Sequence, residues 1–126
     1  MLSFLGGAFM KNFLITEIDH SSSVDSPAVT VLHDGRFIVA WHSNKTGDFD
    51  SYGSIYNSDG SIDIPEFKIN STTSSSQIMP KLSPLSDGGF VATWRDKGSD
   101  GDSFGTFSQI FSSDGTKVFQ EFQVNT

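Results

Sequence analysis

The stretch "DGRFIVAW" at Asp34–Trp41 decides the fold, because the chain repeats it 53 residues later as "DGGFVATW" at Asp87–Trp94. Each copy begins with Asp-Gly, a pair typical of tight β-hairpin turns. Each continues as an apolar run of β-branched and aromatic residues, which is typical of a strand covered on both faces. The duplication predicts a protein built from two copies of one small antiparallel sheet.

The repeat extends well beyond this stretch. "SPAVTVLHDGRFIVAW" at Ser26–Trp41 aligns with "MPKLSPLSDGGFVATW" at Met79–Trp94, and "SIYNSDGS" at Ser54–Ser61 aligns with "QIFSSDGT" at Gln109–Thr116. A third motif, headed by Phe, occurs three times: in NFLITE (Asn12–Glu17), EFKINST (Glu66–Thr72) and EFQVNT (Glu121–Thr126). A period near ~50 residues with several short strands per unit indicates a propeller, a solenoid or a similar array.

Each unit is predicted to form four strands. A Pro precedes the first strand, and apolar and polar residues alternate in the last, as is typical of an edge strand. The expected strands are Ala28–Leu32, Phe37–Trp41, Tyr52–Tyr56 and Phe67–Asn70 in the first unit, and Lys81–Leu85, Phe90–Trp94, Phe104–Phe111 and Phe122–Asn125 in the second. No segment has apolar residues at the helical spacing, so we expect almost no helix. We predict an all-β fold of two four-stranded antiparallel, propeller-like blades, with a β-sandwich as the alternative.

The chain is expected to hold one domain. Residues 1–11 are predicted to be an apolar N-terminal arm or extension, and residues 12–126 a single all-β domain of two repeats, about 12–65 and 66–126. The extra copy of the fourth-strand motif, at Phe13–Glu17, predicts a ninth strand. This strand either completes a sheet in a neighbouring chain or is the end of a preceding blade.

The number of blades raises a question of assembly. A closed propeller has about four to eight blades, and this chain supplies two, which would leave large aromatic faces in water. We therefore expect the chain to associate with itself, and three chains would supply six blades. The alternatives are that the chain is a fragment of a longer array, or that its two sheets cover each other.

Charge and composition exclude several classes of partner. The chain has 8 basic and 15 acidic residues, a net charge of −7, which argues against nucleic acid and anionic membranes as partners. The N-terminal apolar run is too short to span a bilayer, so no membrane insertion is expected. It also lacks the basic start and cleavage site of a clear signal peptide. There is no Cys, which excludes thiol chemistry and disulfides.

The combination of "DGGFVATW", "SSDG" and "EFQVNT" resembles a repeat found in tandem in very large bacterial surface and secreted proteins, over about residues 12–126. This resemblance implies extracellular or cell-surface display and adhesion, although the missing signal peptide leaves a cytoplasmic location open. The two-blade plan is also similar to small bacterial and fungal propeller lectins, which trimerise and bind sugars between blades. Together these resemblances imply a lectin-like carbohydrate-binding module; the alternative is a structural repeat of a bacterial surface adhesin.

Residues that could bind a glycan lie at the ends of the apolar strands and in or near the acidic loops Lys45–Gly53 and Asp96–Gly105. An aromatic ring stacks on a pyranose, although both tryptophans equally suit core packing, and polar side chains bond sugar hydroxyls. The expected ligand-binding residues are Trp41, His42, Asn44, Asp50, Trp94, Arg95 and Asp102.

The same loops offer weaker candidates for calcium. Carboxylates two residues apart suit Ca²⁺, but neither loop has the spacing of an EF-hand or of the Gly-rich calcium repeat. The candidates are Asp48, Asp50, Asp100 and Asp102. We expect no cofactor, with calcium as the alternative.

Nothing in the sequence predicts catalysis. There is no G-x-S-x-G motif and no Cys, and the three histidines His20, His33 and His42 do not recur in the second copy. We therefore expect a protein that binds rather than an enzyme.

Overall fold

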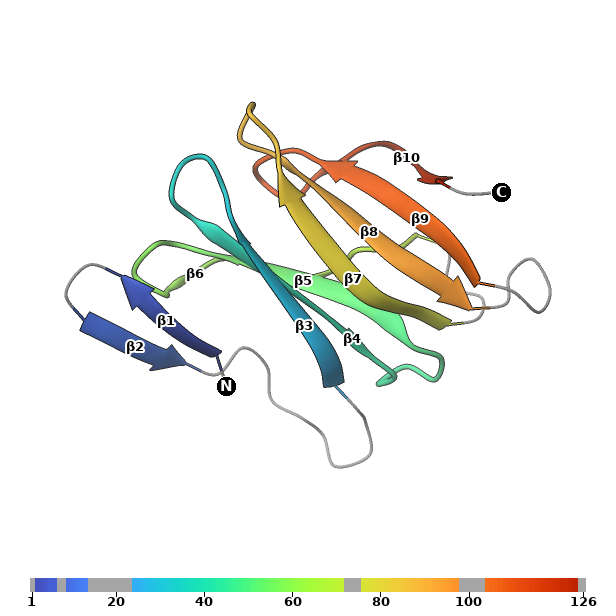
Figure 1. The fold of residues 1–126 in the computed structure, drawn as a ribbon, viewed down its shortest axis with the longest axis horizontal. Coiled ribbons are helices and arrows are strands. Elements are labelled where there is room, and N and C mark those ends of the chain that lie inside the picture. The colour runs from blue at the N-terminus through green and yellow to red at the C-terminus, as the bar shows by residue number, and fades with distance from the viewer. Residues whose placement is uncertain (1, 7–8, 14–23, 72–75, 98–103, 125–126) are drawn as a thin grey trace.

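The computed structural model describes residues 2–6, 9–13, 24–71, 76–97 and 104–124, and over these ranges the protein is all-β without a helix (Figure 1). Sheet one is an antiparallel meander of β3 (Val24–Val31), β4 (Phe37–Ser43), β5 (Asp50–Tyr56) and β6 (Ile62–Lys68). Sheet two repeats it with β7 (Ser76–Pro84), β8 (Phe90–Lys97), β9 (Phe104–Phe111) and β10 (Lys117–Gln123). The predicted pair of four-stranded, blade-like sheets is confirmed.

The N-terminal segment forms a hairpin of its own. β1 (Leu2–Gly6) pairs antiparallel with β2 (Phe9–Phe13) in a two-stranded sheet. The expected ninth strand, Phe13–Glu17, falls largely on residues outside the described part of the chain.

The four Asp-Gly pairs within the described residues all form tight turns; the fifth pair, Asp100-Gly101, lies outside the described part of the chain. The glycines of these four pairs, Gly35, Gly60, Gly88 and Gly115, have φ between 85° and 94°, which L side chains rarely adopt. Each turn is closed by a backbone hydrogen bond, such as Leu32 N–H to the Arg36 carbonyl at 2.8 Å. The Asp of each of these four pairs also accepts the backbone N–H two residues further on, at 2.9–3.1 Å. Asp-Gly therefore specifies these three-residue hairpin loops locally.

One turn also ties the two sheets together. The guanidinium of Arg36 donates from Nε to Asp34 at 2.8 Å and from Nη1 to Asp63 at 3.0 Å, both in sheet one or its turns. Its Nη2 donates to the carbonyl oxygen of Ser113, in the β9–β10 turn, at 2.7 Å. The same side chain therefore bridges turns from both repeats.

Each sheet has two faces that carry different residues. The tryptophan face consists of Phe37, Val39, Trp41, Tyr52 and Tyr56 in sheet one, and of Phe90, Ala92, Trp94, Phe107 and Phe111 in sheet two. The isoleucine face, on the other side, consists of Ile38, Ala40, Ile55, Ile64 and Phe67 in sheet one, and of Val91, Thr93, Ile110, Val118 and Phe122 in sheet two.

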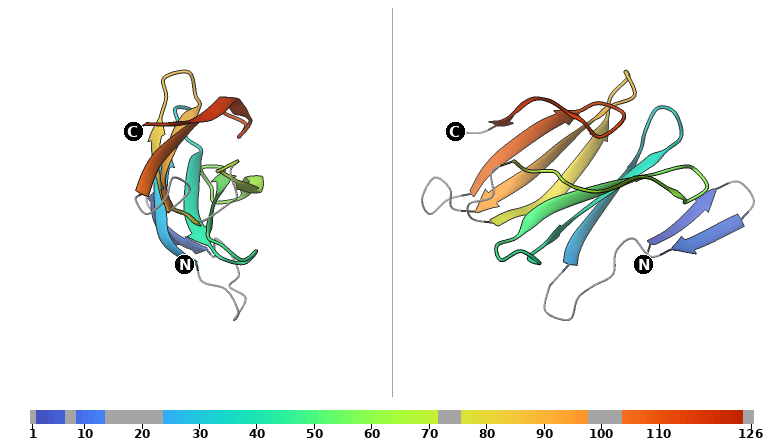
Figure 2. Two further views of the ribbon diagram at one scale, coloured as in Figure 1. Left: turned by 90° about the vertical axis from the view of Figure 1, so that its right-hand side faces the viewer. Right: turned by 180° about the vertical axis from the view of Figure 1, so that it is seen from behind.

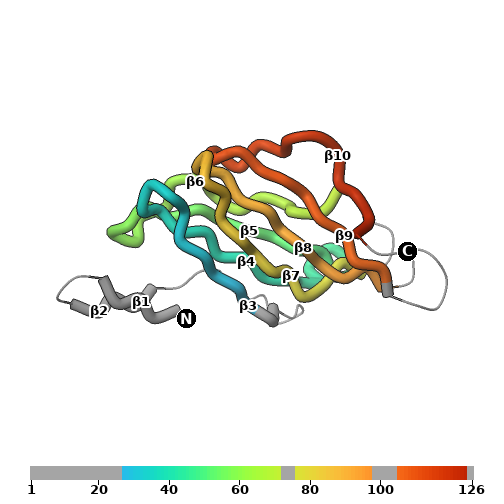
Figure 3. The backbone as a smooth tube through the Cα atoms, turned by 45° about the horizontal axis from the view of Figure 1, so that its top comes forward, coloured from blue at the N-terminus to red at the C-terminus, as the bar shows by residue number. Residues whose placement is uncertain are grey.

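The main core forms where the isoleucine face of sheet one meets the tryptophan face of sheet two. The rings of Phe67 and Phe111 lie 5.8 Å apart, and Phe90 stacks on Phe111 at 4.8 Å. Strand β7 crosses sheet one and contacts β3, β4 and β5, so the sheets form two layers (Figures 2 and 3). The tryptophan face of sheet one forms a second, separate cluster, in which Phe37 stacks on Tyr56 at 5.3 Å.

The prediction that both second strands are covered on both faces is right for β4 and wrong for β8. Every residue of β4 is buried. In β8, burial alternates: Phe90 and Trp94 are buried, Thr93 is half-buried and Arg95 is exposed. The physical reason is that, within the described residues, no third sheet covers the isoleucine face of sheet two.

Candidate functional site

Both predicted sugar-stacking tryptophans lie in the interior. Trp41 is 2% exposed and stacks on Tyr52 at 6.5 Å between ring centroids. Trp94 is 1% exposed, and its indole Nε1 donates to Oε1 of the buried Gln77 at 2.8 Å. This burial agrees with the core-packing interpretation, because neither ring leaves a face open for a pyranose in the chain as it stands.

Gln77 is the centre of a buried polar network that joins the sheets. Its backbone N–H donates to the carbonyl oxygen of Phe49 at 2.7 Å, and its own carbonyl accepts the Ser51 hydroxyl at 3.0 Å. With the Trp94 bond, this residue connects the β4–β5 loop and β5 of sheet one to β8 of sheet two. Nothing in the sequence pointed to it, since a polar residue in a Ser-rich linker is ordinarily solvated.

Asp50 serves the same junction. It is 3% exposed; Oδ1 accepts the Asn70 side-chain amide at 2.9 Å, and Oδ2 accepts the Thr46 hydroxyl at 3.3 Å. The ammonium of Lys68 lies 3.4 Å from Oδ2. Hydrogen-bond donors and a cation therefore already occupy the carboxylate, and it anchors the β4–β5 loop against β6.

The remaining acidic candidates are dispersed. Asp48 is exposed in the β4–β5 loop, and the half-buried Asn44 uses its carbonyl oxygen to accept Gly47 N–H at 3.0 Å. Asp100 and Asp102 lie outside the described residues. Within the part of the chain that the structure describes, no three His, Cys, Asp or Glu side chains gather as a metal site would require.

Two predicted residues do come together, at the end of the sheets where β4 and β8 finish. The alignment places His42 opposite Arg95, and both contact Met79 of β7. The backbone N–H of Met79 donates to His42 Nδ1 at 3.1 Å, and Arg95 Nη1 lies 3.9 Å from Met79 Sδ. The edge of His42 packs on Phe49 at 5.1 Å. We call His42, Phe49, Met79 and Arg95 the junction cluster.

The backbone at Met79 is unusual. Its φ is 56°, in a β-bulge where the β7–β8 register shifts between Ile78 and Lys81. A non-glycine residue in this region is strained by about 1 kcal/mol, and such strain gathers at functional positions. The Met79 side chain is exposed, with its sulfur near Arg95, while its backbone N–H is bound to His42. Sequence reasoning missed Met79, because no residue type marks the bulge, although the register shift recurs at the equivalent place in the first repeat, between Asp25 and Ala28.

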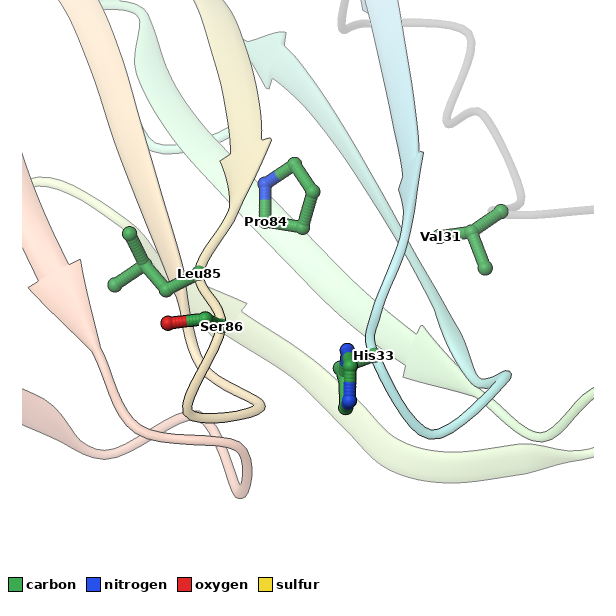
Figure 4. Close-up of a pocket in the computed structure, with 5 residues that line it drawn as sticks. All are labelled: Val31, His33, Pro84, Leu85 and Ser86. Carbon is green, nitrogen blue, oxygen red and sulfur yellow. The ribbon is translucent and has the colours of Figure 1, made fainter.

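A shallow hollow lies at the opposite end, between the first turns of the two sheets. It has a volume of about 300 Å³ and is lined by Val31, His33, Pro84, Leu85 and Ser86. Figure 4 shows Pro84 between β7 and β3, whereas Val31 points to the far side of β3. The lining comes from equivalent positions of the two repeats, but it brings few polar groups together and is open to solvent.

No protein-family model, curated protein or solved structure matches the chain. Within its described residues there is no helix long and apolar enough to cross a membrane. Two features of the structure could support binding: the packing of the isoleucine face of sheet one on the tryptophan face of sheet two, and the junction cluster.

Proposed function

We propose that this chain is a non-enzymatic module that works by binding, and that its principal partner is another repeat sheet of its own kind. The observation that carries the proposal is the contact inside the chain, where the isoleucine face of one repeat receives the tryptophan face of the next. Such a contact is directional and can be repeated, so it suits a structural repeat that builds a ring or an array. Display on a bacterial surface, which the sequence resemblance implies, fits such a role.

The test is the mass of the particle in solution. Light scattering after size-exclusion chromatography, over micromolar to millimolar protein, is expected to give a mass that rises above one chain. A mass of one chain throughout that range would refute assembly as the function.

Glycan binding is the second candidate, and the junction cluster favours it. The cluster brings the exposed guanidinium of Arg95 and the exposed thioether of Met79 next to the buried imidazole of His42, so residues of both repeats meet at one place on the surface. Shallow sites of this kind bind weakly singly and gain avidity through assembly. A glycan array with wild type and Arg95→Ala distinguishes the two functions. Binding lost in the variant supports the lectin role, whereas no binding by wild type removes it.

A further inference from the structure

The exposed large hydrophobic residues gather on two surfaces. Among the described residues there are seven: Val29, Val31, Ile62, Met79, Phe119, Phe122 and Val124. Apart from Met79, which lies in the junction cluster, they fall into one group in sheet one and one group at the C-terminal edge of sheet two. Large apolar groups gathered in this way mark interaction surfaces.

The first group surrounds the tryptophan face of sheet one. In the strand register, Val29 pairs with Val39, Val31 with Phe37, and Ile62 with Tyr56, so all three point to that face. We call Val29, Val31 and Ile62 the rim. The centre of this face is covered within the chain, whereas the rim is open.

The second group extends the isoleucine face of sheet two. Phe122 pairs with Ser108, which pairs with Thr93 on that face. The N–H of Val124 donates to the Thr106 carbonyl at 2.7 Å, in the same way that Ile69 N–H donates to Ser51. We call Phe119, Phe122 and Val124 the open edge.

The equivalent residues of sheet one show how this surface packs when another sheet covers it. By alignment, Phe119, Phe122 and Val124 correspond to Ile64, Phe67 and Ile69. Ile69 is fully buried in the inter-sheet core, and Ile64 and Phe67 pack against it. Phe119, in contrast, is 85% exposed. The same surface is therefore covered by a sheet in the first repeat and uncovered in the second.

The other half of the contact has its own counterpart. Leu82 of sheet two packs against the inter-sheet core from the tryptophan face. The alignment places Val29 at the position of Leu82, and Val29 is exposed. Through Val29, the rim therefore occupies the periphery of the surface by which sheet two contacts sheet one, while the centre of that surface in sheet one, at Phe37 and Trp41, is already covered within the chain.

The backbone holds Phe119 outward. Its φ is 64°, within a bulge where the β9–β10 register shifts between Val118 and Phe122. The buried side chain of Gln109 donates from Nε2 to the carbonyls of Val118 at 3.2 Å and Phe119 at 3.0 Å. An exposed aromatic residue fixed in a strained conformation is typical of a contact residue.

We propose that the open edge of sheet two binds the rim of sheet one on a second copy of this chain, head to tail. The inference rests on the proposed assembly and specifies its two surfaces. Because the surfaces differ, each copy has one of each, and assembly continues until a ring closes or an array grows.

Charged substitutions at exposed positions test the pairing of the two surfaces. Phe119→Asp places a charge on the open edge and Val31→Asp places one on the rim, and Ser58→Asp, in the exposed β5–β6 turn, is the control at a position on neither surface. Circular dichroism and thermal melting verify that each variant folds, and light scattering gives the mass. The two surface variants are expected to need at least tenfold more protein to assemble, whereas the control assembles like wild type.

Mixing the two surface variants gives the decisive measurement. The Phe119→Asp protein keeps its rim and the Val31→Asp protein keeps its open edge, so the mixture is expected to form a one-to-one pair and nothing larger. If wild type assembles and the variants still assemble alone, or the mixture stays monomeric, the assignment of surfaces is wrong while the proposed assembly survives. If wild type never assembles, both are wrong.

Discussion

Replacing Trp94 by Phe tests the buried bridge that connects the two sheets. The indole Nε1 donates to Gln77 Oε1 at 2.8 Å, and both residues are almost fully buried. Leaving the Gln77 acceptor without this donor costs about 1–3 kcal/mol. The smaller ring leaves roughly 40 Å³ empty, which at ~24 cal/mol per Å³ adds about 1 kcal/mol. We expect Trp94→Phe to lower the free energy of unfolding by about 2–4 kcal/mol.

A matched substitution and a double-mutant cycle separate the loss of the hydrogen bond from the effect of the cavity. Trp41→Phe, at the equivalent position of sheet one, loses ring volume without touching Gln77, and should cost about 1–2 kcal/mol. Urea denaturation followed by far-ultraviolet circular dichroism measures all variants without relying on tryptophan fluorescence. In the cycle of Trp94→Phe with Gln77→Leu, we expect a coupling of about 1–2 kcal/mol. Equal losses for the two tryptophan variants, with a coupling below ~0.5 kcal/mol, would refute the bridge.

Three further predictions concern the turns. A Cβ at Gly89 would lie 2.3 Å from the carbonyl oxygen of Phe111, so Gly89→Ala should lower the free energy of unfolding by about 2–4 kcal/mol. Gly88→Ala has no such clash and meets only the penalty for positive φ, so it should cost about 1–2 kcal/mol. Equal losses for the two variants in chemical denaturation would contradict this prediction. Arg36→Met removes three hydrogen bonds, one of them to sheet two, and should cost about 1–3 kcal/mol at neutral pH, with no loss in melting temperature as the opposing result. Hydrogen bonds from Ser112, then from the side chain and backbone of Thr116, lower the pKa of Asp114 to about 2. The contribution of Asp114 to stability is therefore complete above pH ~3.8 and is lost as the pH falls through ~2. Asp114→Asn should reduce the loss of stability over this acid range, and an unchanged loss would exclude Asp114 as its source.

Local signals predicted the strands and turns well. Asp-Gly marks the turns of the β3–β4, β5–β6, β7–β8 and β9–β10 hairpins, because a glycine with positive φ and an Asp that accepts the N–H two residues further on need no distant partner. The largest errors in the boundaries are at the last strand of each unit: β6 was expected at Phe67–Asn70 and lies at Ile62–Lys68, and β10 was expected at Phe122–Asn125 and lies at Lys117–Gln123. The polar run "SIDIPE" with Pro65 does not read as a strand, yet Pro is tolerated here because β6 is at the edge of its sheet.

The candidate site was less predictable, because it depends on how the sheets meet. Trp41 and Trp94 suited both a core and a sugar platform in the sequence, and only the packing places them inside. The burial of Gln77 arises from contacts with Phe49 and Ser51, which are far from it in the chain, and the bulges at Met79 and Phe119 are register shifts between consecutive strands that no residue type marks. His42 and Arg95 were selected by alignment, but Met79, the residue that both contact, could not be identified from it.

The isoleucine face of sheet two is more polar than the isoleucine face of sheet one, and this difference affects assembly. Sheet one presents Ala40 beside Gly53, where a Cβ on the glycine would lie 3.3 Å from the Phe67 ring, so the close contact requires small residues. Sheet two has Thr93 beside Ser108 at the same positions, and their hydroxyls bond each other at 2.8 Å. This bond uses only one of the two hydroxyl protons, so covering the pair requires a partner for the other O–H or costs about 1–3 kcal/mol. The pair also makes this face less apolar than the one inside the chain, so contact between chains should be weaker than contact between repeats, and assembly should depend on concentration.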